Sequence, residues 1–158
     1  MEREKISEFT RRISQCNKSG LTLITYEILF AYIEEAKNAC ADGDYDGFKQ
    51  GVRKASGCLE RLMETLNFNY EISKDLYPIY RFYRDELNMA VVKKETQKLD
   101  TVEGVLRNLY EAFTEAAKED HSQPLMQNSE KVIAGMTYQK NNLTETYAMG
   151  DESRGFLV

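Results

Sequence analysis

The clearest candidate for a ligand-binding motif in this sequence is residues 42–47, which read Asp-Gly-Asp-Tyr-Asp-Gly. Acidic side chains at alternate positions, followed by a glycine, match the opening of an EF-hand loop, which binds calcium through oxygen ligands. An EF-hand loop also needs a glutamate at its twelfth position, but that position is Arg53, which carries the wrong charge. We therefore interpret residues 42–47 as a tight turn between two helices, with an acidic side chain capping the second helix.

Other catalytic and metal-binding patterns are missing from the sequence. It has one histidine, His121, and no Glu-x-x-His motif, which excludes a three-histidine zinc site and the ferritin-like ligand pattern of a helical bundle. There is no glycine-rich phosphate-binding loop. Cys16, Cys40 and Cys58 lie far apart with no CxxC pair, which favours reduced thiols over a disulfide or a zinc site. We expect no cofactor, no metal and no enzymatic activity.

The composition indicates a folded domain without affinity for nucleic acid. The chain has 158 residues, of which 42% are hydrophobic and 30% charged, enough for one domain with its own core. The formal net charge of −5 disfavours binding to a phosphate backbone. No apolar run approaches the roughly 20 residues that a membrane span needs. The N-terminal residues are charged and precede no signal-type apolar core, so we expect the protein in the cytoplasm, with no membrane insertion.

The sequence predicts that the fold is built from helices. Four long helical patterns occupy about 21–41, 44–66, 73–96 and 101–118, and short links between them favour antiparallel neighbours. We therefore predict an all-α fold, an antiparallel up-down-up-down four-helix bundle formed by residues 20–118. Residues 1–19 precede it, with Ile6, Phe9 and Ile13 spaced for a short amphipathic helix. Residues 119–158 form a polar C-terminal extension, partly flexible or docked on the bundle.

Several positions carry more local predictions. Gly47, Gly51 and Gly57 lie in or near the second helical pattern, where we expect them to allow a close approach of helices that offsets their poor helix propensity. Pro78 lies in the early turns of the third pattern and should bend or fray them, because proline donates no backbone hydrogen bond. Asp100 or Thr101 can cap the start of the fourth helix.

The first helical pattern has more apolar surface than one contact face requires. At about 100° per residue, five side chains point in one direction, and Leu29, Ile33, Ala36 and Cys40 lie next to them. Those five are Leu21, Ile24, Ile28, Tyr32 and Ala39. A polar side remains only at Glu27, Glu34 and Asn38. Either other helices cover this wide apolar arc, or part of it is reserved for a partner.

Aromatic residues concentrate on the first and third helical patterns, where tyrosine suits a binding groove because it gives a large contact area with a polar tip. The alternative is that these residues belong to the core and its boundary. On the apolar excess alone, we predict a partner-binding groove formed by Ile24, Tyr26, Phe30, Ile33, Tyr80, Phe82 and Tyr83.

The order of these features resembles the FliS family of flagellin-specific export chaperones over about residues 18–118. The resemblance rests on four weak motifs in a shared order: Leu23, Ile24, Tyr26 and Glu27; Lys54, Ala55, Leu59 and residues 62–67; residues 75–83; and residues 102–113. Gly20 stands where the family has a helix-opening proline, and Phe113 where it has a tryptophan. The N-terminal segment that caps the groove in relatives is matched loosely by Phe9 or Ile13.

This resemblance implies a cytoplasmic chaperone that is not an enzyme. Such a protein would bind the disordered C-terminal region of flagellin in a hydrophobic groove, prevent premature polymerisation and deliver flagellin to the flagellar export apparatus. Helix-in-groove packing suits such a guest, which folds as an amphipathic helix in the filament. We expect a monomer or a weak homodimer.

Two further hypotheses follow from the apolar excess. The N-terminal amphipathic stretch, or the apolar residues 156–158, would cover the groove when flagellin is absent, since soluble monomers rarely expose large apolar patches. Alternatively, the apolar arc is a homodimer seam, and the protein is a helical-bundle adaptor or signalling module.

Overall fold

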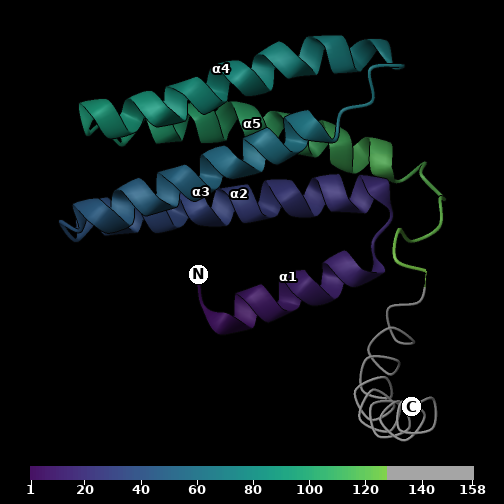
Figure 1. Cartoon of the computed structure of the whole chain (residues 1–158), viewed down its shortest axis with the longest axis horizontal. Helices are drawn as coiled ribbons and strands as arrows, with labels where there is room; N and C mark the ends of the chain where they lie inside the picture. The colour runs from purple at the N-terminus through teal and green to yellow at the C-terminus, as the bar shows by residue number, and fades with distance from the viewer. Residues whose placement is uncertain (128–158) are drawn as a thin grey trace, which may run out of the picture.

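The computed structural model describes residues 1–127, which contain five α-helices and no β-strand (Figure 1). The helices are α1 (Arg3–Gln15), α2 (Lys18–Ala41), α3 (Tyr45–Glu64), α4 (Glu71–Lys93) and α5 (Gln97–Ala117). The short amphipathic helix predicted near the N-terminus is confirmed as α1. Most of the predicted C-terminal extension, residues 128–158, lies outside the described residues, and so does the apolar stretch 156–158. None of the helices in residues 1–127 is long and apolar enough to cross a membrane.

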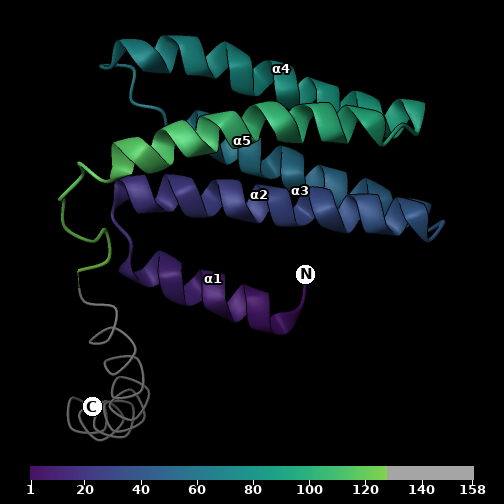
Figure 2. The ribbon, with the colours of Figure 1, turned by 180° about the vertical axis from the view of Figure 1, so that it is seen from behind.

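The four long helices lie alongside one another, and the chain reverses direction from each to the next (Figures 1 and 2). α2 packs against α3 and α5, and α4 packs against the same two helices, so each of the four has two long neighbours. The shorter α1 packs on α2, on the side of the molecule away from α4 (Figure 2). α2 is therefore in contact with three other helices.

One continuous apolar core joins the four long helices, and the buried residues that α2 contributes to it lie between Tyr26 and Ala36. Six side chains of α2 are buried: Ile24, Tyr26, Leu29, Phe30, Ile33 and Ala36. Four of the nine arc residues named from the sequence thus belong to the core: Ile24, Leu29, Ile33 and Ala36. The other five are half-buried: Leu21, Ile28, Tyr32, Ala39 and Cys40.

The segment that resembles a calcium loop is the turn between α2 and α3, as interpreted from the sequence. Gly43 has a φ of +75°, which a residue with a side chain adopts only with strain. Asp44 caps α3 by accepting a hydrogen bond of 2.9 Å from the backbone N–H of Gly47. Within residues 1–127, no cluster of histidine, cysteine and acidic side chains could hold a metal ion.

The glycines of α3 differ in what surrounds them. A Cβ atom at Gly51 would lie 2.8 Å from the Cβ of Ala36 and 2.9 Å from its backbone, so Gly51 permits the predicted close approach of α2 and α3. At Gly57 a Cβ would meet no atom within 4 Å. The prediction of close packing is therefore wrong for Gly57, which borders open space.

The predicted start of the fourth helix is also wrong, and the predicted fraying at Pro78 does not occur. α5 begins at Gln97, one turn before the predicted start at Thr101, and Thr96 precedes it without a side-chain cap. The reason is Leu99, which is fully buried and extends the apolar stripe of α5 toward its N-terminus. α4 begins at Glu71 and continues through Pro78, so the proline does not fray the helix. Pro78 is exposed, and its ring occupies the solvent side of α4.

Candidate partner-binding site

The seven residues predicted to form a groove do not share one open surface. Ile24, Tyr26, Phe30, Ile33 and Tyr80 are buried, and none is more than 8% exposed. Tyr83 is half-buried, and Phe82 is 56% exposed. A partner can therefore reach Phe82 and part of Tyr83 directly, whereas the other five residues lie beneath the surface.

The structure brings three of the seven residues together inside the molecule, around Tyr26. The hydroxyl oxygens of Tyr26 and Tyr80 lie 2.7 Å apart and share a hydrogen bond. The Tyr26 ring also packs at centroid distances of 5.9–6.2 Å against Phe30, Tyr110 and Phe113. Burial raises the pKa of both Tyr26 and Tyr80, so their hydroxyl groups stay neutral. This cluster connects α2, α4 and α5 at the centre of the core.

Phe82 and Tyr83 form a separate aromatic pair on α4. Their ring centroids lie 5.1 Å apart in an edge-to-face arrangement. α4 also exposes Tyr77, Met89 and Val92, which gives its outer side several isolated apolar side chains. This pair therefore belongs to a different side of the molecule from the surface of α2.

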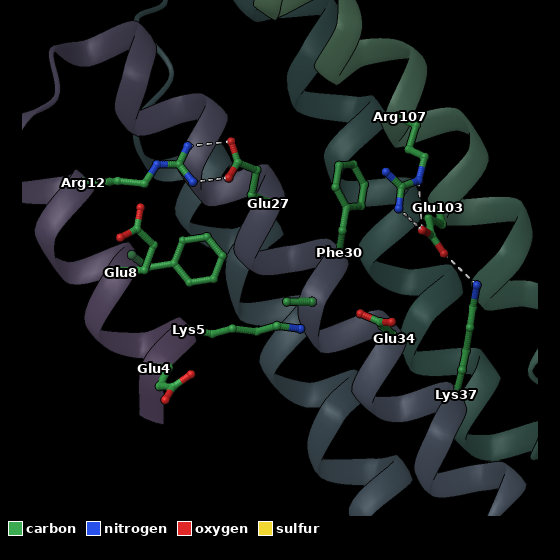
Figure 3. Close-up of a pocket in the computed structure, with 12 residues that line it drawn as sticks. Glu4, Lys5, Glu8, Arg12, Glu27, Phe30, Glu34, Lys37, Glu103 and Arg107 are labelled. Carbon is green, nitrogen blue, oxygen red and sulfur yellow. Dashed lines mark hydrogen bonds and ion pairs between the residues drawn. The ribbon is translucent and has the colours of Figure 1, made fainter. Parts of the chain in front are cut away.

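A first hollow, which we call the α1 cleft, lies between α1, α2 and α5 and has a volume of about 770 Å³ (Figure 3). Charged side chains of both signs dominate its lining, with Phe9, Phe30 and Ala31 as the apolar residues. Two ion pairs cross between helices in the cleft, Arg12 with Glu27 and Lys37 with Glu103, and the dashed lines in Figure 3 mark both.

One set of paired charges attaches α1 to α2. The guanidinium of Arg12 donates two hydrogen bonds, of 2.5 and 2.8 Å, to the carboxylate of Glu27. The hydroxyl of Tyr110 donates a third, of 3.1 Å. These hydrogen bonds, above all those from Arg12, lower the pKa of Glu27 despite its partial burial. The polar side of α2 predicted from the sequence is thus the side on which α1 lies.

A second set joins α2 to α5 through the carboxylate of Glu103. Lys37 lies 2.6 Å and Arg107 2.5 Å from Glu103, and Lys37 also reaches Asp100 at 2.5 Å. Burial would raise the pKa of Glu103, but the hydrogen bonds from Lys37 and Arg107 hold it below its ordinary value. The guanidinium carbon of Arg107 lies 4.5 Å from the centroid of the Phe30 ring, so this network covers Phe30.

α1 itself is only lightly anchored. None of its residues is buried, Ile6 is 50% exposed, and Phe9 and Ile13 are half-buried. A helix with so little buried apolar surface opens at a lower free energy than the core helices. Besides its apolar contacts with α2, α1 is attached by the pair between Arg12 and Glu27, and the N-terminal amine before it pairs with Glu35 of α2 at 3.1 Å.

A second hollow, which we call the α2–α3 trough, has a volume of about 800 Å³ and a different chemistry. Its floor consists of the half-buried α2 residues Leu21, Ile28 and Tyr32, together with Thr25 of α2 and Cys58 of α3. Ile13 and Leu125 close one end, and Gly57 leaves space in the opposite wall. Its rim carries Lys18, Lys54 and Arg61, and none of the residues of 1–127 that line it is acidic.

The trough contains three half-buried residues of the apolar arc of α2. Leu21, Ile28 and Tyr32 point in one direction on α2 and are separated by seven and four residues, as in the stripe that the sequence predicted. Sequence reasoning found this direction but assigned the groove to neighbouring positions that the core uses. Gly57 is the sequence feature that could have distinguished the trough residues from the buried positions, because it leaves a gap in α3 opposite the stripe.

The comparisons with known proteins agree with the helical architecture. The family model for "Flagellar protein FliS" matches residues 4–120, which includes all five helices except the first residue of α1. The chain belongs to the FliS family. A curated relative is the "Flagellar secretion chaperone FliS" of Bacillus subtilis (strain 168), 28% identical over 108 residues, which cover 68% of this chain and 81% of the relative. FliS is a family of chaperones rather than enzymes, which is consistent with the absence of a catalytic motif from the sequence.

Proposed function

We propose that this FliS chain is a flagellar secretion chaperone that holds the C-terminal segment of flagellin in the α2–α3 trough. The observation that carries this proposal is an apolar hollow of about 800 Å³ that the described helices leave unfilled, on a chain of the FliS family. Bound there, flagellin is kept from polymerising in the cytoplasm until it reaches the flagellar export apparatus. This function requires only that flagellin is bound and later released.

The dimensions of the trough suit an amphipathic helix. Leu21 and Tyr32 are eleven residues apart, which corresponds to about 16 Å along α2, or three helical turns. A guest helix of the same length presents three or four apolar side chains at spacings of three and four residues. Burying each large side chain contributes about 1.5–3 kcal/mol, so four give roughly 6–12 kcal/mol before the cost of ordering the guest. Affinities in the micromolar range then follow, which permits release.

In this proposal α2–α5 act as the rigid support, an antiparallel up-down-up-down four-helix bundle over residues 20–118. Residues 1–19 and 119–158 are attachments to it. Five of the residues predicted to line the groove are buried inside this support: Ile24, Tyr26, Phe30, Ile33 and Tyr80. Phe82 and Tyr83 offer a second apolar contact on α4. The chaperone is a monomer or a weak homodimer.

The experiment that tests this function is calorimetry of the full chain against the C-terminal segment of flagellin from the same organism. The decisive variant is Gly57→Phe, because a side chain there meets no atom within 4 Å and projects toward the trough. Replacing a helical glycine also improves helix propensity, so the fold is retained. Gly104→Phe on α5 is the matched control, since Gly104 has equally open surroundings outside the trough.

We expect Gly57→Phe to weaken flagellin binding at least tenfold, about 1.4 kcal/mol, and Gly104→Phe to leave it unchanged. Equal binding by the two variants would remove the trough from the site. Phe82→Ser distinguishes the contact on α4, because weaker binding in that variant would place Phe82 in the site as the sequence predicted. A stable dimer that does not bind flagellin would instead favour the homodimeric adaptor.

A further inference from the structure

We propose that residues 141–153 of this chain lie in the α2–α3 trough when no partner is bound, so that the chaperone covers its own binding surface. The inference rests on the proposed function for its purpose, because it assigns an internal occupant to the same trough. Its test needs no flagellin, so the two proposals can fail separately.

The first argument is the course of the chain after α5. The side-chain amide of Asn17 donates hydrogen bonds to the backbone oxygens of Asp120, at 3.3 Å, and Ser122, at 3.4 Å. Ser19 hydrogen-bonds to the carboxylate of Asp120. These contacts fix the start of the extension to the connection between α1 and α2 (Figure 1). The extension therefore begins beside the end of the trough rather than at an arbitrary place.

The second argument is that the described part of the extension already enters the trough. The backbone N–H of Leu125 donates a hydrogen bond of 2.9 Å to the carbonyl oxygen of Cys16. The Leu125 side chain lines the trough at the same end as Ile13, yet remains 55% exposed. The sixteen residues from Leu125 to residue 141 can span up to about 50 Å, whereas the trough is about 16 Å long. The following segment can thus reach any part of it.

The third argument is complementary chemistry. Residues 141–153 contain three acidic side chains, Glu145, Asp151 and Glu152, and neither lysine nor arginine. The trough has the opposite character, with three basic side chains at its rim and no acidic side chain among the described residues that line it. Leu143 and Tyr147 supply two large apolar side chains four residues apart for the apolar floor. A tether of this length also gives an effective concentration of about millimolar, so weak contacts suffice for occupancy.

The thiol of Cys58 reports occupancy, because Cys58 lies in the floor of the trough. Burial raises its pKa to about 12, so it reacts slowly, and a covering segment slows it further. The experiment compares the rate of N-ethylmaleimide modification in full-length chains that carry Cys16→Ser and Cys40→Ser. The variant Leu143→Ser with Tyr147→Ser removes the two apolar anchors. The matched control is Phe156→Ser with Leu157→Ser, which changes apolar residues outside the proposed segment.

We expect the anchor variant to react about tenfold faster than the parent and the control to react at the parent's rate, with helical circular dichroism retained throughout. Lys54→Glu, which reverses one rim charge, should also speed the reaction. Unchanged rates in the anchor variant would overturn the proposal, as would equal acceleration in the control. Protection of Cys58 that depends on protein concentration would point to a second copy of the chain instead, and would also overturn it.

Flagellin binding separates the two proposals. Removing an internal competitor should tighten flagellin binding by the anchor variant, by up to the same factor of about ten. If the anchor variant leaves Cys58 reactivity unchanged while flagellin still binds the trough, the internal occupant is refuted and the proposed function stands. If Cys58 is protected by the extension but flagellin does not bind, the proposed function fails and the internal occupant stands.

Discussion

The ion pair between Arg12 and Glu27 joins α1 to α2, and Arg12→Met tests how much this pair contributes. Methionine keeps much of the length and apolar stem of arginine but removes both hydrogen bonds to the Glu27 carboxylate. After the substitution, Glu27 keeps only the hydrogen bond from Tyr110. We expect α1 to separate from α2 more often, while α2–α5 stay folded.

The magnitude follows from the geometry and the exposure of the pair. Two charge-assisted hydrogen bonds in a protected setting contribute about 1.5–3 kcal/mol. The side chains of Arg12 and Glu27 are 35% and 24% exposed, so solvent screening reduces this to about 1–2 kcal/mol. The population with α1 detached should therefore rise about 5- to 30-fold.

Hydrogen–deuterium exchange of the α1 amides, measured on peptides from residues 1–16, reports this population directly. The matched control is Arg11→Met, because Arg11 pairs with Glu8 within α1 and makes no bridge to α2. The control should exchange at the rate of the unmodified protein. If both variants exchange equally fast, or if Arg12→Met exchanges no faster than the unmodified protein, then the ion pair does not hold α1 and the reasoning is wrong.

Three further outcomes follow from the structure. Because Glu27 has a lowered pKa, its stabilisation of the docked α1 is complete above its ordinary pKa of 4.5 and is lost as the pH falls through the lowered pKa. Hydrogen–deuterium exchange of the α1 amides, corrected for intrinsic rates, should therefore rise at acid pH. Gly51→Val should destabilise the fold by about 2 kcal/mol, seen as a lower urea midpoint, because its side chain would overlap Ala36; an unchanged midpoint would contradict the close approach. Tyr80→Phe should cost about 1–2 kcal/mol in the same assay by leaving the Tyr26 hydroxyl without its partner, and adding Tyr26→Phe should recover part of that loss.

Local rules were sufficient for features that depend on a few neighbouring residues. The turn before α3 follows from glycine at position 43 and an acidic cap at Asp44, both of which act within four residues. The first residue of α5 was harder to predict because capping and apolar packing favoured different starting points. Asp100 offers a cap, but Leu99 lies three residues before Val102 and extends the buried stripe, so packing outweighed capping.

At the candidate site, the sequence could predict the direction of side chains but not which of them other helices cover. Periodicity gives the direction in which a side chain leaves α2, and it correctly grouped Leu21, Ile28 and Tyr32. It cannot say which neighbouring helix covers each direction, so Tyr26 and Phe30 looked as available as the trough residues. Likewise, Glu27 was placed on the polar side of α2, but its partner could be found only once α1 was positioned.

The carbonyl oxygen of Cys16 belongs to two segments at once. It stands at the residue that ends α1, and it accepts the hydrogen bond that fixes Leu125. A movement of α1 away from α2 displaces that oxygen and weakens the attachment of the extension, and the coupling free energy is the same in the opposite direction. A ligand that displaces either segment should therefore favour release of the other.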